Sequence, residues 1–161
     1  MNTELYQTFY HSPLGTIEIA GTTEAVTDVK FVENKTSYAA TPVPPVLLDC
    51  TQQLQEYFAG QRKVFSVKMA AQGTPFQQSV WDYVAKIPYG KTVSYKTIAL
   101  LLGDAGASRA VGMANGKNPL LLLVPCHRVI SQDGSLTGYA GGLWRKQWLL
   151  DKENEEQLRL F

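Results

Sequence analysis

The segment that most constrains this chain is an apolar run that ends in three reactive side chains. Leu120 to Val124 is long enough to be buried on every side, and Pro125 follows it directly. The next three residues are Cys126, His127 and Arg128. Aliphatic side chains would fill this position at lower cost, because a buried polar group destabilises a fold unless it finds a partner. The arrangement therefore predicts chemistry at the thiol of Cys126.

A cysteine beside a histidine is typical of nucleophilic catalysis. The thiolate is the reactive form, so the thiol pKa must fall from its ordinary value of about 8.5 for fast reaction at neutral pH. A neighbouring imidazole can act as the base, and a third group usually orients that imidazole. Glu153 and Asp151 are the nearest carboxylates downstream. Taken alone, the pair fits a thiol hydrolase, a redox enzyme, a group-transfer protein or an inert buried cysteine.

The remaining cysteine and histidine argue against a metal site. The chain has two cysteines and two histidines, and it contains no CxxC pair. Cys50 lies on the apolar stripe of an expected helix, where a thiol is more often a small buried hydrophobe. His11 is far from His127 in sequence. We therefore expect free thiols and no structural zinc.

The first half of the chain predicts a small α/β domain over residues 1–73. Residues 4–33 alternate in hydrophobicity and contain two turn signals, which indicates an antiparallel meander of three strands. Residues 34–45 are polar and proline-rich, as in a loop. Pro45 to Gly60 has apolar residues at every fourth position and is expected to be a helix. A short strand is expected from Phe65 to Met69.

The second half, residues 74–161, predicts a mainly helical domain. Thr74 and Gln77 form a capping box ahead of a helix that Pro88 ends. Ser94 is a suitable N-cap for a helix from Tyr95 to Leu102, and a second helix is expected from Ala107 to Asn115. Two short helices joined by a tight, glycine-containing turn form a candidate helix-turn-helix.

The rest of this half predicts a turn and one more helix. Asp133 and Gly134 indicate a tight hairpin turn. A final helix is expected from Leu143 to about Glu153.

The charge pattern adds a weaker indication. Residues 75–149 hold eight Lys and Arg against three Asp and Glu, a net charge of +5, whereas residues 1–74 hold five against seven, a net charge of −2. A basic middle section favours contact with phosphates, although scattered solubilising lysines would give the same count.

The composition is that of an ordinary soluble globular protein, with 45% hydrophobic and 18% charged residues. No window of eighteen successive apolar residues occurs, and the N-terminus lacks the features of a signal peptide. We expect a cytoplasmic protein without membrane contact.

Several ordered motifs of the second half resemble the O6-alkylguanine-DNA alkyltransferase family. They are Ser94-Tyr95, Ser108-Arg109-Ala110-Val111-Gly112, Asn118-Pro119, Val124-Pro125-Cys126-His127-Arg128-Val129 and Gly138-Tyr139-Ala140-Gly141-Gly142-Leu143. The first half is similar more weakly, through Ser12-Pro13-Leu14-Gly15. The resemblance implies an α/β (α+β) fold with a ribonuclease H-like N-terminal domain and a helical, DNA-binding C-terminal domain.

The same resemblance implies direct repair of alkylated DNA. The alkyl group of O6-alkylguanine, and of O4-alkylthymine, would move to Cys126 after the base has been flipped out of the stack. The thioether is stable, so each molecule would act once, without a cofactor. The expected partner is double-stranded DNA, bound through the minor groove with little sequence preference. The protein would be a monomer in solution, associated with the nucleoid when on DNA.

The resemblance also implies individual roles. His127 would take the thiol proton through a water, Glu153 would orient the imidazole, and Tyr95 would protonate N3 of the departing guanine. Arg109 would enter the base stack in place of the flipped base. The other residues implied are DNA contacts, at Ser94, Ala110, Ala114, Asn115 and Gly116, and a hinge and substrate pocket, at Asn118, Val129, Tyr139 and Ala140. The role of Arg128 stays open.

Three other functions are compatible with parts of the pattern. A non-catalytic protein could bind alkyl lesions and recruit other repair factors, although family relatives of that kind carry Trp in place of the cysteine. A helix-turn-helix transcription regulator would need polar, base-reading side chains on the second helix, which is rich in Ala and Gly. A cysteine hydrolase would turn over without salt-dependent binding to DNA.

Overall fold

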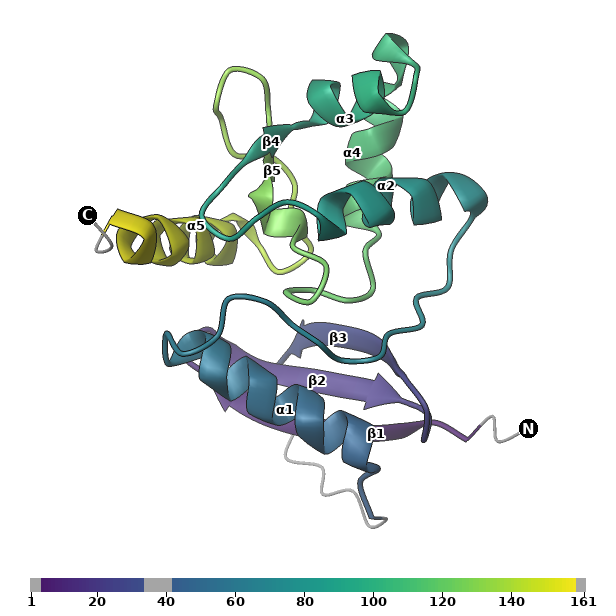
Figure 1. The fold of residues 1–161 in the computed structure, drawn as a ribbon, viewed down its shortest axis with the longest axis vertical. Coiled ribbons are helices and arrows are strands. Elements are labelled where there is room, and N and C mark those ends of the chain that lie inside the picture. Colours follow the sequence, from purple (N-terminus) through teal and green to yellow (C-terminus); the bar gives the residue numbers. More distant parts are fainter. Residues whose placement is uncertain (1–3, 34–41, 159–161) are drawn as a thin grey trace. The chain divides into compact units, whose positions relative to one another are not determined.

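Three strands of seven residues each form an antiparallel sheet near the N-terminus (Figure 1). They are β1 (Tyr6–Ser12), β2 (Gly15–Gly21) and β3 (Val26–Val32), in the order β1-β2-β3. Residues are paired from Tyr6↔Gly21 to Ser12↔Gly15 across the first two strands. Because side chains alternate along a strand, Ile17 and Ile19 of β2 point to one face and are buried. The predicted meander is confirmed.

The helix α1 (Pro45–Phe58) packs against this sheet. Its apolar stripe, with Leu47, Leu54 and Tyr57, is buried, and the Cys50 thiol is buried with it. The structure, a computed structural model, describes residues 4–33 and 42–158, so most of the loop expected at residues 34–45 lies outside the described residues. The chain divides into two compact units, Met1–Gln72 and Gly73–Phe161. The mixed α/β character of the fold is confirmed.

The short strand expected from Phe65 to Met69 does not form. This segment makes a single bridge, between Val26 and Met69. The N–H of Val26 donates to the carbonyl of Lys68 and the N–H of Ala70 donates to the carbonyl of Val26, both at 2.9 Å. Only Val26 of β3 bonds to the segment, so alternation of apolar residues alone was not enough to make a strand.

The second unit begins with the capped helix α2 (Pro75–Ala85). The N–H of Gln77 donates to Thr74 Oγ1 at 3.1 Å and the N–H of Thr74 donates to Gln77 Oε1 at 2.9 Å, as the predicted capping box requires. Trp81 on the buried face of α2 donates its indole N–H to the carbonyl of Ala114 at 2.8 Å. This bond fixes α2 to the helix that carries Ala114.

The predicted helix-turn-helix is present. The two-residue strand β4 (Val93–Ser94) leads into α3 (Tyr95–Leu101), and Ser94 Oγ accepts from the N–H of Thr97 at 3.0 Å. Gly103, with φ of +87°, ends the turn of the first helix in a conformation that favours glycine. A 3₁₀ turn, η1 (Ala105–Ala107), precedes α4 (Ser108–Gly116), which packs on α2 and α3.

The segment after the apolar run is short and irregular. Cys126–Arg128 form one 3₁₀ turn, η2, followed by the strand β5 (Val129–Ile130). This strand pairs with β4 in parallel, through Val93↔Val129 and Ser94↔Ile130. The last described element is α5 (Leu143–Leu158), which is longer than the helix expected from the sequence.

The hairpin expected at Asp133-Gly134 is only partly correct. A tight turn is closed by the N–H of Gly134 on the carbonyl of Ser131, at 2.9 Å. No second strand follows it within the described part of this unit, and β5 pairs with β4 alone. The segment from Asp133 to α5 is a loop.

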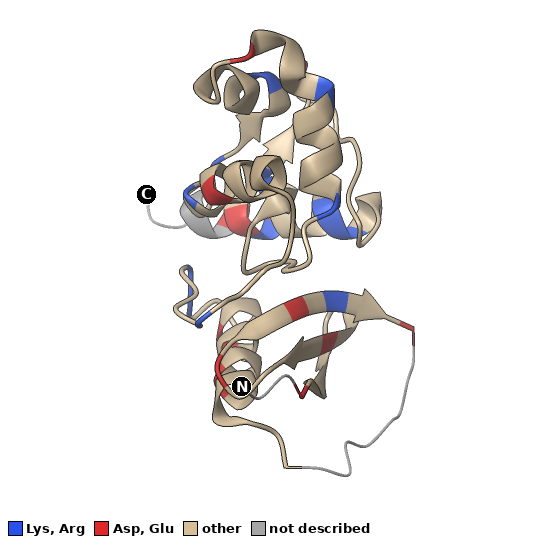
Figure 2. Cartoon of the chain, turned by 90° about the vertical axis from the view of Figure 1, so that its right-hand side faces the viewer, with Lys and Arg blue, Asp and Glu red and all other residues tan. Residues whose placement is uncertain are grey.

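The basic residues of the second unit are spread over several elements (Figure 2). Lys96 lies on α3, Arg109 on α4 and Lys146 on α5. None of the described helices is long and apolar enough to cross a bilayer.

The capping box gives a direct test of α2. Replacing Thr74 by Ala removes the acceptor for the N–H of Gln77 and should lower the free energy of unfolding by about 1 kcal/mol. Thr74→Ser keeps the hydroxyl and should change stability by much less. Urea unfolding followed by circular dichroism measures both variants. Equal stabilities of the Ala and Ser variants would contradict the role of this cap.

Candidate active site

The apolar run ahead of Cys126 is folded into tight turns. Leu122 has φ of +74°, and the N–H of Leu123 donates to the carbonyl of Leu121 at 2.9 Å, which makes a γ-turn centred on Leu122. Leu122 is the one non-glycine residue with positive φ among the described residues. Pro125, with φ of −79° and ψ of 64°, is at the centre of an inverse γ-turn, closed by the N–H of Cys126 on the carbonyl of Val124 at 2.7 Å. Two successive γ-turns fix the backbone that carries the thiol.

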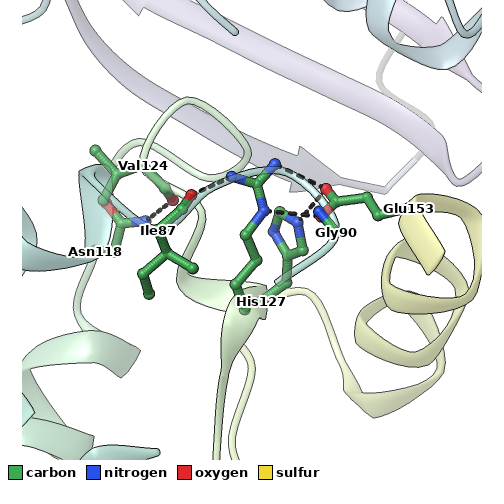
Figure 3. A network of polar contacts seen from close by, with 7 residues as sticks. Ile87, Gly90, Asn118, Val124, His127 and Glu153 are labelled. Atoms are coloured by element: carbon green, nitrogen blue, oxygen red, sulfur yellow. Dashed lines mark hydrogen bonds and ion pairs between the residues drawn. The ribbon is translucent and has the colours of Figure 1, made fainter. Parts of the chain in front are cut away.

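Two asparagine side chains hold these turns in place. Asn118 Nδ2 donates to the carbonyl of Val124 at 2.9 Å (Figure 3). It also donates to the carbonyl of Leu120 at 3.3 Å, while its Oδ1 accepts from the N–H of Leu120 at 3.0 Å. Asn115, on α4, donates through Nδ2 to the carbonyl of Cys126 at 3.2 Å. Both asparagines are buried. The end of α4 and the cysteine segment are therefore tied together by side-chain amides.

The thiol of Cys126 is buried, at 2% exposure, and is free of any disulfide. Burial raises its pKa to about 11, although the hydrogen bond of Asn118 and the charge of Lys146 act in the opposite direction. The resting sulfur is therefore a neutral thiol at neutral pH. It needs a base before it can act as a nucleophile.

Glu153 of α5 is a buried carboxylate that accepts several hydrogen bonds beside the turn that carries Cys126 (Figure 3). His127 Nε2 lies 2.7 Å from Glu153 Oε2. Arg128 donates through Nε to Oε1 at 2.8 Å and through Nη2 to Oε2 at 3.0 Å, a bidentate pair. The N–H of Gly90 donates to Oε1 at 3.3 Å. Burial raises the pKa of Glu153, but the hydrogen bonds and charges of His127 and Arg128 more than offset this and lower it, so the group is a carboxylate.

The imidazole of His127 is fully buried, at 0% exposure. Burial lowers its pKa; Glu153 acts to raise it, whereas Arg128 and Lys146 act to lower it further. Because the carboxylate can only accept, the hydrogen of the neutral ring belongs on Nε2. Nδ1 has no hydrogen-bond partner among the described residues and is the acceptor nitrogen.

A buried lysine lies on the other side of the cysteine turn. Lys146 of α5 donates through Nζ to the carbonyls of Val129 and Thr137, both at 2.7 Å, and lies 3.5 Å from Tyr95 Oη. Tyr95 Oη also donates to the carbonyl of Thr137 at 3.1 Å. Burial lowers the pKa of Lys146 to about 8, while Cys126 acts to raise it. An ammonium that can release a proton near neutral pH therefore contacts a tyrosine hydroxyl.

A pocket of about 770 Å³ opens between the helix-turn-helix and the loop after β5. Its lining includes Tyr95, Arg109, Gly112, Thr137 and Gly138. A Cβ atom at Gly112 would lie 3.8 Å from the ring of Tyr95, which is an ordinary van der Waals distance. The pocket is large enough for a small heterocycle and has an exposed arginine at its edge.

Two family profiles match the chain. The profile described as the 6-O-methylguanine DNA methyltransferase ribonuclease-like domain matches residues 5–71, and that of the DNA binding domain matches residues 75–155. The chain belongs to the 6-O-methylguanine DNA methyltransferase family. Among its relatives is the methylated-DNA–protein-cysteine methyltransferase of Methanosarcina acetivorans, 44% identical over 153 residues, which cover 92% of this chain and 98% of that protein.

Solved structures of the methyltransferase family have a similar fold and sequence. The crystal structure of Mycobacterium tuberculosis O6-methylguanine methyltransferase matches with a TM-score of 0.85 and 42% identity, over 95% of this chain and 94% of that one. The structure of M. tuberculosis OGT in complex with DNA matches with a TM-score of 0.83 and 45% identity, over 92% of each chain. The predicted family membership is confirmed.

The structure brings most of the expected methyltransferase residues into one unit. Cys126, His127 and Glu153 form one buried cluster, and Tyr95 and Arg109 line the pocket. Ser94 caps α3. Ala110 and Gly116 are exposed on α4, and Ala140 is exposed beyond the pocket lining.

Five of the expected residues lie differently from the expectation: Ala140, which is outside the pocket lining, and the four that follow. Ala114 and Asn115, expected to contact DNA, are buried: α4 turns them toward Trp81 and the carbonyl of Cys126. Val129, expected in the substrate pocket, accepts a hydrogen bond from Lys146 through its carbonyl. Tyr139 is buried, with its ring 6.5 Å from that of His127 and its hydroxyl without a hydrogen-bond partner among the described residues. Neither Val129 nor Tyr139 lines the pocket.

Lys146 and the partners of Arg128 were not found from the sequence. A signal for Lys146 exists, because Lys146, Leu149 and Glu153 are spaced three and seven residues apart and lie on one face of a helix. Leu149 is plainly a core residue, so the two charged residues on its face are expected in the interior as well. The bidentate pair of Arg128 had no comparable signal, because its acceptor lies 25 residues away.

The charge cluster predicts how stability depends on pH. Glu153 has a pKa lowered below its ordinary value of 4.5, so the carboxylate stabilises the folded state above that pH, and this contribution is lost as the pH falls below it. Glu153→Gln should therefore reduce the free energy of unfolding by about 3–5 kcal/mol at pH 7, because it leaves Arg128 buried without a counter-charge. The difference from the wild type should shrink between pH 5 and pH 3. Urea unfolding at a series of pH values measures it.

The matched control is Asp151→Asn, an exposed carboxylate near Glu153 on α5. It should give a pH dependence close to that of the wild type. A Glu153→Gln variant whose deficit is the same at pH 7 and pH 3 would contradict this assignment.

Proposed function

We propose that this protein repairs DNA directly, by moving the alkyl group of O6-alkylguanine, and of O4-alkylthymine, to Cys126 in a single irreversible transfer. The observation that carries the proposal is the free, buried thiol of Cys126 beside the His127–Glu153 pair, in a chain that belongs to this methyltransferase family. Each molecule would act once, because a thioether is not reversed by the groups present.

The first half of the transfer activates the thiol. His127 Nδ1 accepts the proton of Cys126 through a water, and Glu153 holds the ring through Nε2. The imidazolium that forms is stabilised by the carboxylate. The sulfur then forms a bond to the alkyl carbon while the bond between that carbon and O6 breaks.

The second half neutralises the leaving purine. Tyr95 donates its hydroxyl proton to N3 of the guanine as negative charge develops on the base. Lys146 lies 3.5 Å from this hydroxyl, and burial lowers its pKa to about 8, so it can replace the proton. The proton taken up by His127 balances the one given to guanine, and the net products are guanine and an alkylated cysteine.

The helix α4 is proposed to enter the minor groove of double-stranded DNA. Ala110 and Gly116 are exposed and small, so the helix can approach the groove closely, and the longer side chain of Arg109, which is also exposed, would reach beyond them. Minor-groove readout is degenerate, which gives little sequence preference and suits repair at any position. Arg109 would occupy the space of the flipped base, whose unstacking costs a few kcal/mol and less at a damaged pair.

The remaining parts of the proposal concern the context of the reaction. We propose domains of residues 1–73 and 74–161, a monomeric protein in the cytoplasm, and association with the nucleoid on DNA. Support for a monomer comes from the second unit, which holds Cys126, His127, Glu153, Tyr95 and Arg109 in one chain. No step above requires a cofactor.

Alkyl transfer is tested by the mass of the intact protein. Incubation with a duplex oligonucleotide that carries one O6-methylguanine should add one methyl group per molecule, confined to the peptide with Cys126. Cys126→Ser should gain no mass, and the peptide with Cys50, whose pKa burial raises to about 12, should stay unchanged. DNA binding without any mass change would instead identify a lesion-binding protein, and repeated turnover would identify a hydrolase.

The role of Arg109 is tested by comparing substrates. Arg109→Ala should slow repair of duplex DNA by about 10-fold or more, because the flipped state loses the side chain that replaces the base, at a cost of at least about 1.4 kcal/mol. Reaction with free O6-benzylguanine should be nearly unchanged, since no base needs to be flipped. Lys91→Ala, at an exposed cation outside the pocket lining, is the control and should affect neither substrate. Equal losses on both substrates would exclude the proposed role.

A further inference from the structure

Two hydroxyl groups that the transfer reaction does not use form a chain to the phenol of Tyr95. Ser131, Thr137 and Tyr95 all line the pocket beside the helix-turn-helix. Ser131 Oγ lies 3.2 Å from Thr137 Oγ1, and Thr137 Oγ1 donates to Tyr95 Oη at 3.2 Å. A hydroxyl has one hydrogen, so Ser131 must be the donor in the first of these bonds. The chain therefore runs from Ser131 through Thr137 to Tyr95.

The hydroxyl of Thr137 is the nearer of two donors to the phenol oxygen. The other donor, Lys146 Nζ, lies 3.5 Å from Tyr95 Oη. The shorter bonds of Lys146, both at 2.7 Å, go to the carbonyls of Val129 and Thr137. The position of the phenol oxygen therefore depends most directly on the side chain of Thr137.

The hydrogen of the phenol is held by the backbone of the same residue. Tyr95 Oη donates to the carbonyl of Thr137 at 3.1 Å, and this carbonyl also accepts from Lys146. A hydroxyl hydrogen can turn about its C–O bond while the oxygen stays in place. The hydrogen can therefore leave the carbonyl for a base in the pocket, and the carbonyl keeps Lys146 as its donor.

We propose that Thr137 is a positioning residue for Tyr95, whose phenol oxygen it fixes through its own hydroxyl. When Tyr95 gives its proton to N3 of the departing guanine, the O–H bond breaks, the N–H bond forms, and the electron pair stays on the phenol oxygen. Thr137 keeps its hydrogen and donates it to the oxygen as negative charge develops there, until Lys146 replaces the proton. A hydrogen bond to a charged acceptor is stronger than one to a neutral acceptor, so this contact favours the transition state.

The inference rests on the proposed function, because it assigns a role within that transfer. Its test is the single-turnover rate of methyl transfer from a duplex with one O6-methylguanine, at saturating DNA, together with the Kd for the duplex. Thr137→Val removes the hydroxyl and keeps the backbone carbonyl. It should slow transfer by about 10-fold, as expected for loss of a hydrogen bond to a charged group, and leave the Kd unchanged.

Two matched variants accompany this one. Thr137→Ser keeps the hydroxyl and should react at close to the wild-type rate. Ser135→Ala removes a hydroxyl of the same loop that donates to Asp133 Oδ1 at 2.7 Å, and it should also leave the rate unchanged. Thr137 and Ser135 are both exposed, so all three variants are expected to fold. A Ser variant of Thr137 as slow as the Val variant would overturn the proposal.

A second duplex separates positioning of the phenol from a structural role in the loop. O6-methyl-3-deazaguanine has C–H in place of N3, so it cannot accept the proton of Tyr95. The wild type should transfer its methyl group more slowly than that of O6-methylguanine, and Thr137→Val should cause no further loss. An equal loss on both duplexes, or no loss on O6-methylguanine, would contradict the role of Thr137. A wild type that reacts equally fast with both duplexes would contradict it as well.

Tyr95→Phe completes the test without a modified purine ring. If Thr137 acts through the phenol, Thr137→Val should cost nothing more in a protein that already carries Tyr95→Phe, so the two effects should not add. Additive losses would exclude the proposed role. A wild type that never methylates Cys126 would remove the proposed function and this role with it. A wild type that methylates Cys126, beside an equally fast Thr137→Val, would remove only the role of Thr137.

Discussion

The carboxylate of Glu153 is the interaction on which this site depends. It accepts hydrogen bonds from the ring of His127, from two nitrogens of Arg128 and from the backbone of Gly90, although it is only 1% exposed. These donors come from the turn that carries the thiol and from the loop after α2, so one side chain of α5 fixes both. A buried carboxylate is stable only if its partners stay in place. The hydrogen bonds of Glu153 therefore both position the turn that carries the nucleophile and stabilise the second unit.

The helix α5 contributes to both sides of the proposed reaction. Glu153 orients the base that takes a proton from sulfur, and Lys146, two turns earlier, contacts the tyrosine that would give a proton to the leaving purine. Burial shifts two pKa values of the site in opposite directions: it raises the pKa of the Cys126 thiol to about 11 and lowers that of Lys146 to about 8. Pairs of groups whose pKa values are moved by their environment identify the acid and the base of a site. Here α5 carries Glu153, which contacts the proposed base His127, and Lys146, which contacts the proposed acid Tyr95.

The sequence was informative where a structure depends on neighbouring residues. The capping box at Thr74, the N-cap at Ser94 and the strands of the meander follow from local hydrogen bonds and from alternation, and all three are present. The cluster of Cys126, His127 and Glu153 was recognised through ordered motifs. Prediction failed where the partner is distant in sequence. Ala114 and Asn115 read as part of an exposed small-residue face, but Trp81 and the cysteine turn cover them. The 65–69 segment alternates like a strand, but within the described part of the chain its one β-bridge is to Val26.

The positive φ of Leu122 helps to decide whether the sulfur of Cys126 or the DNA base moves in the proposed reaction. A side chain larger than glycine in this region costs roughly 1–3 kcal/mol and persists only when the surrounding structure over-determines it. Burial of the residues from Leu120 to Val124 and the amides of Asn118 supply that constraint, and the sulfur two residues beyond Val124 inherits it. The backbone that carries this nucleophile is therefore held in one conformation and cannot move toward the alkylated base. In the proposed reaction the flipped base must therefore move to the sulfur, while the sulfur stays in a fixed position.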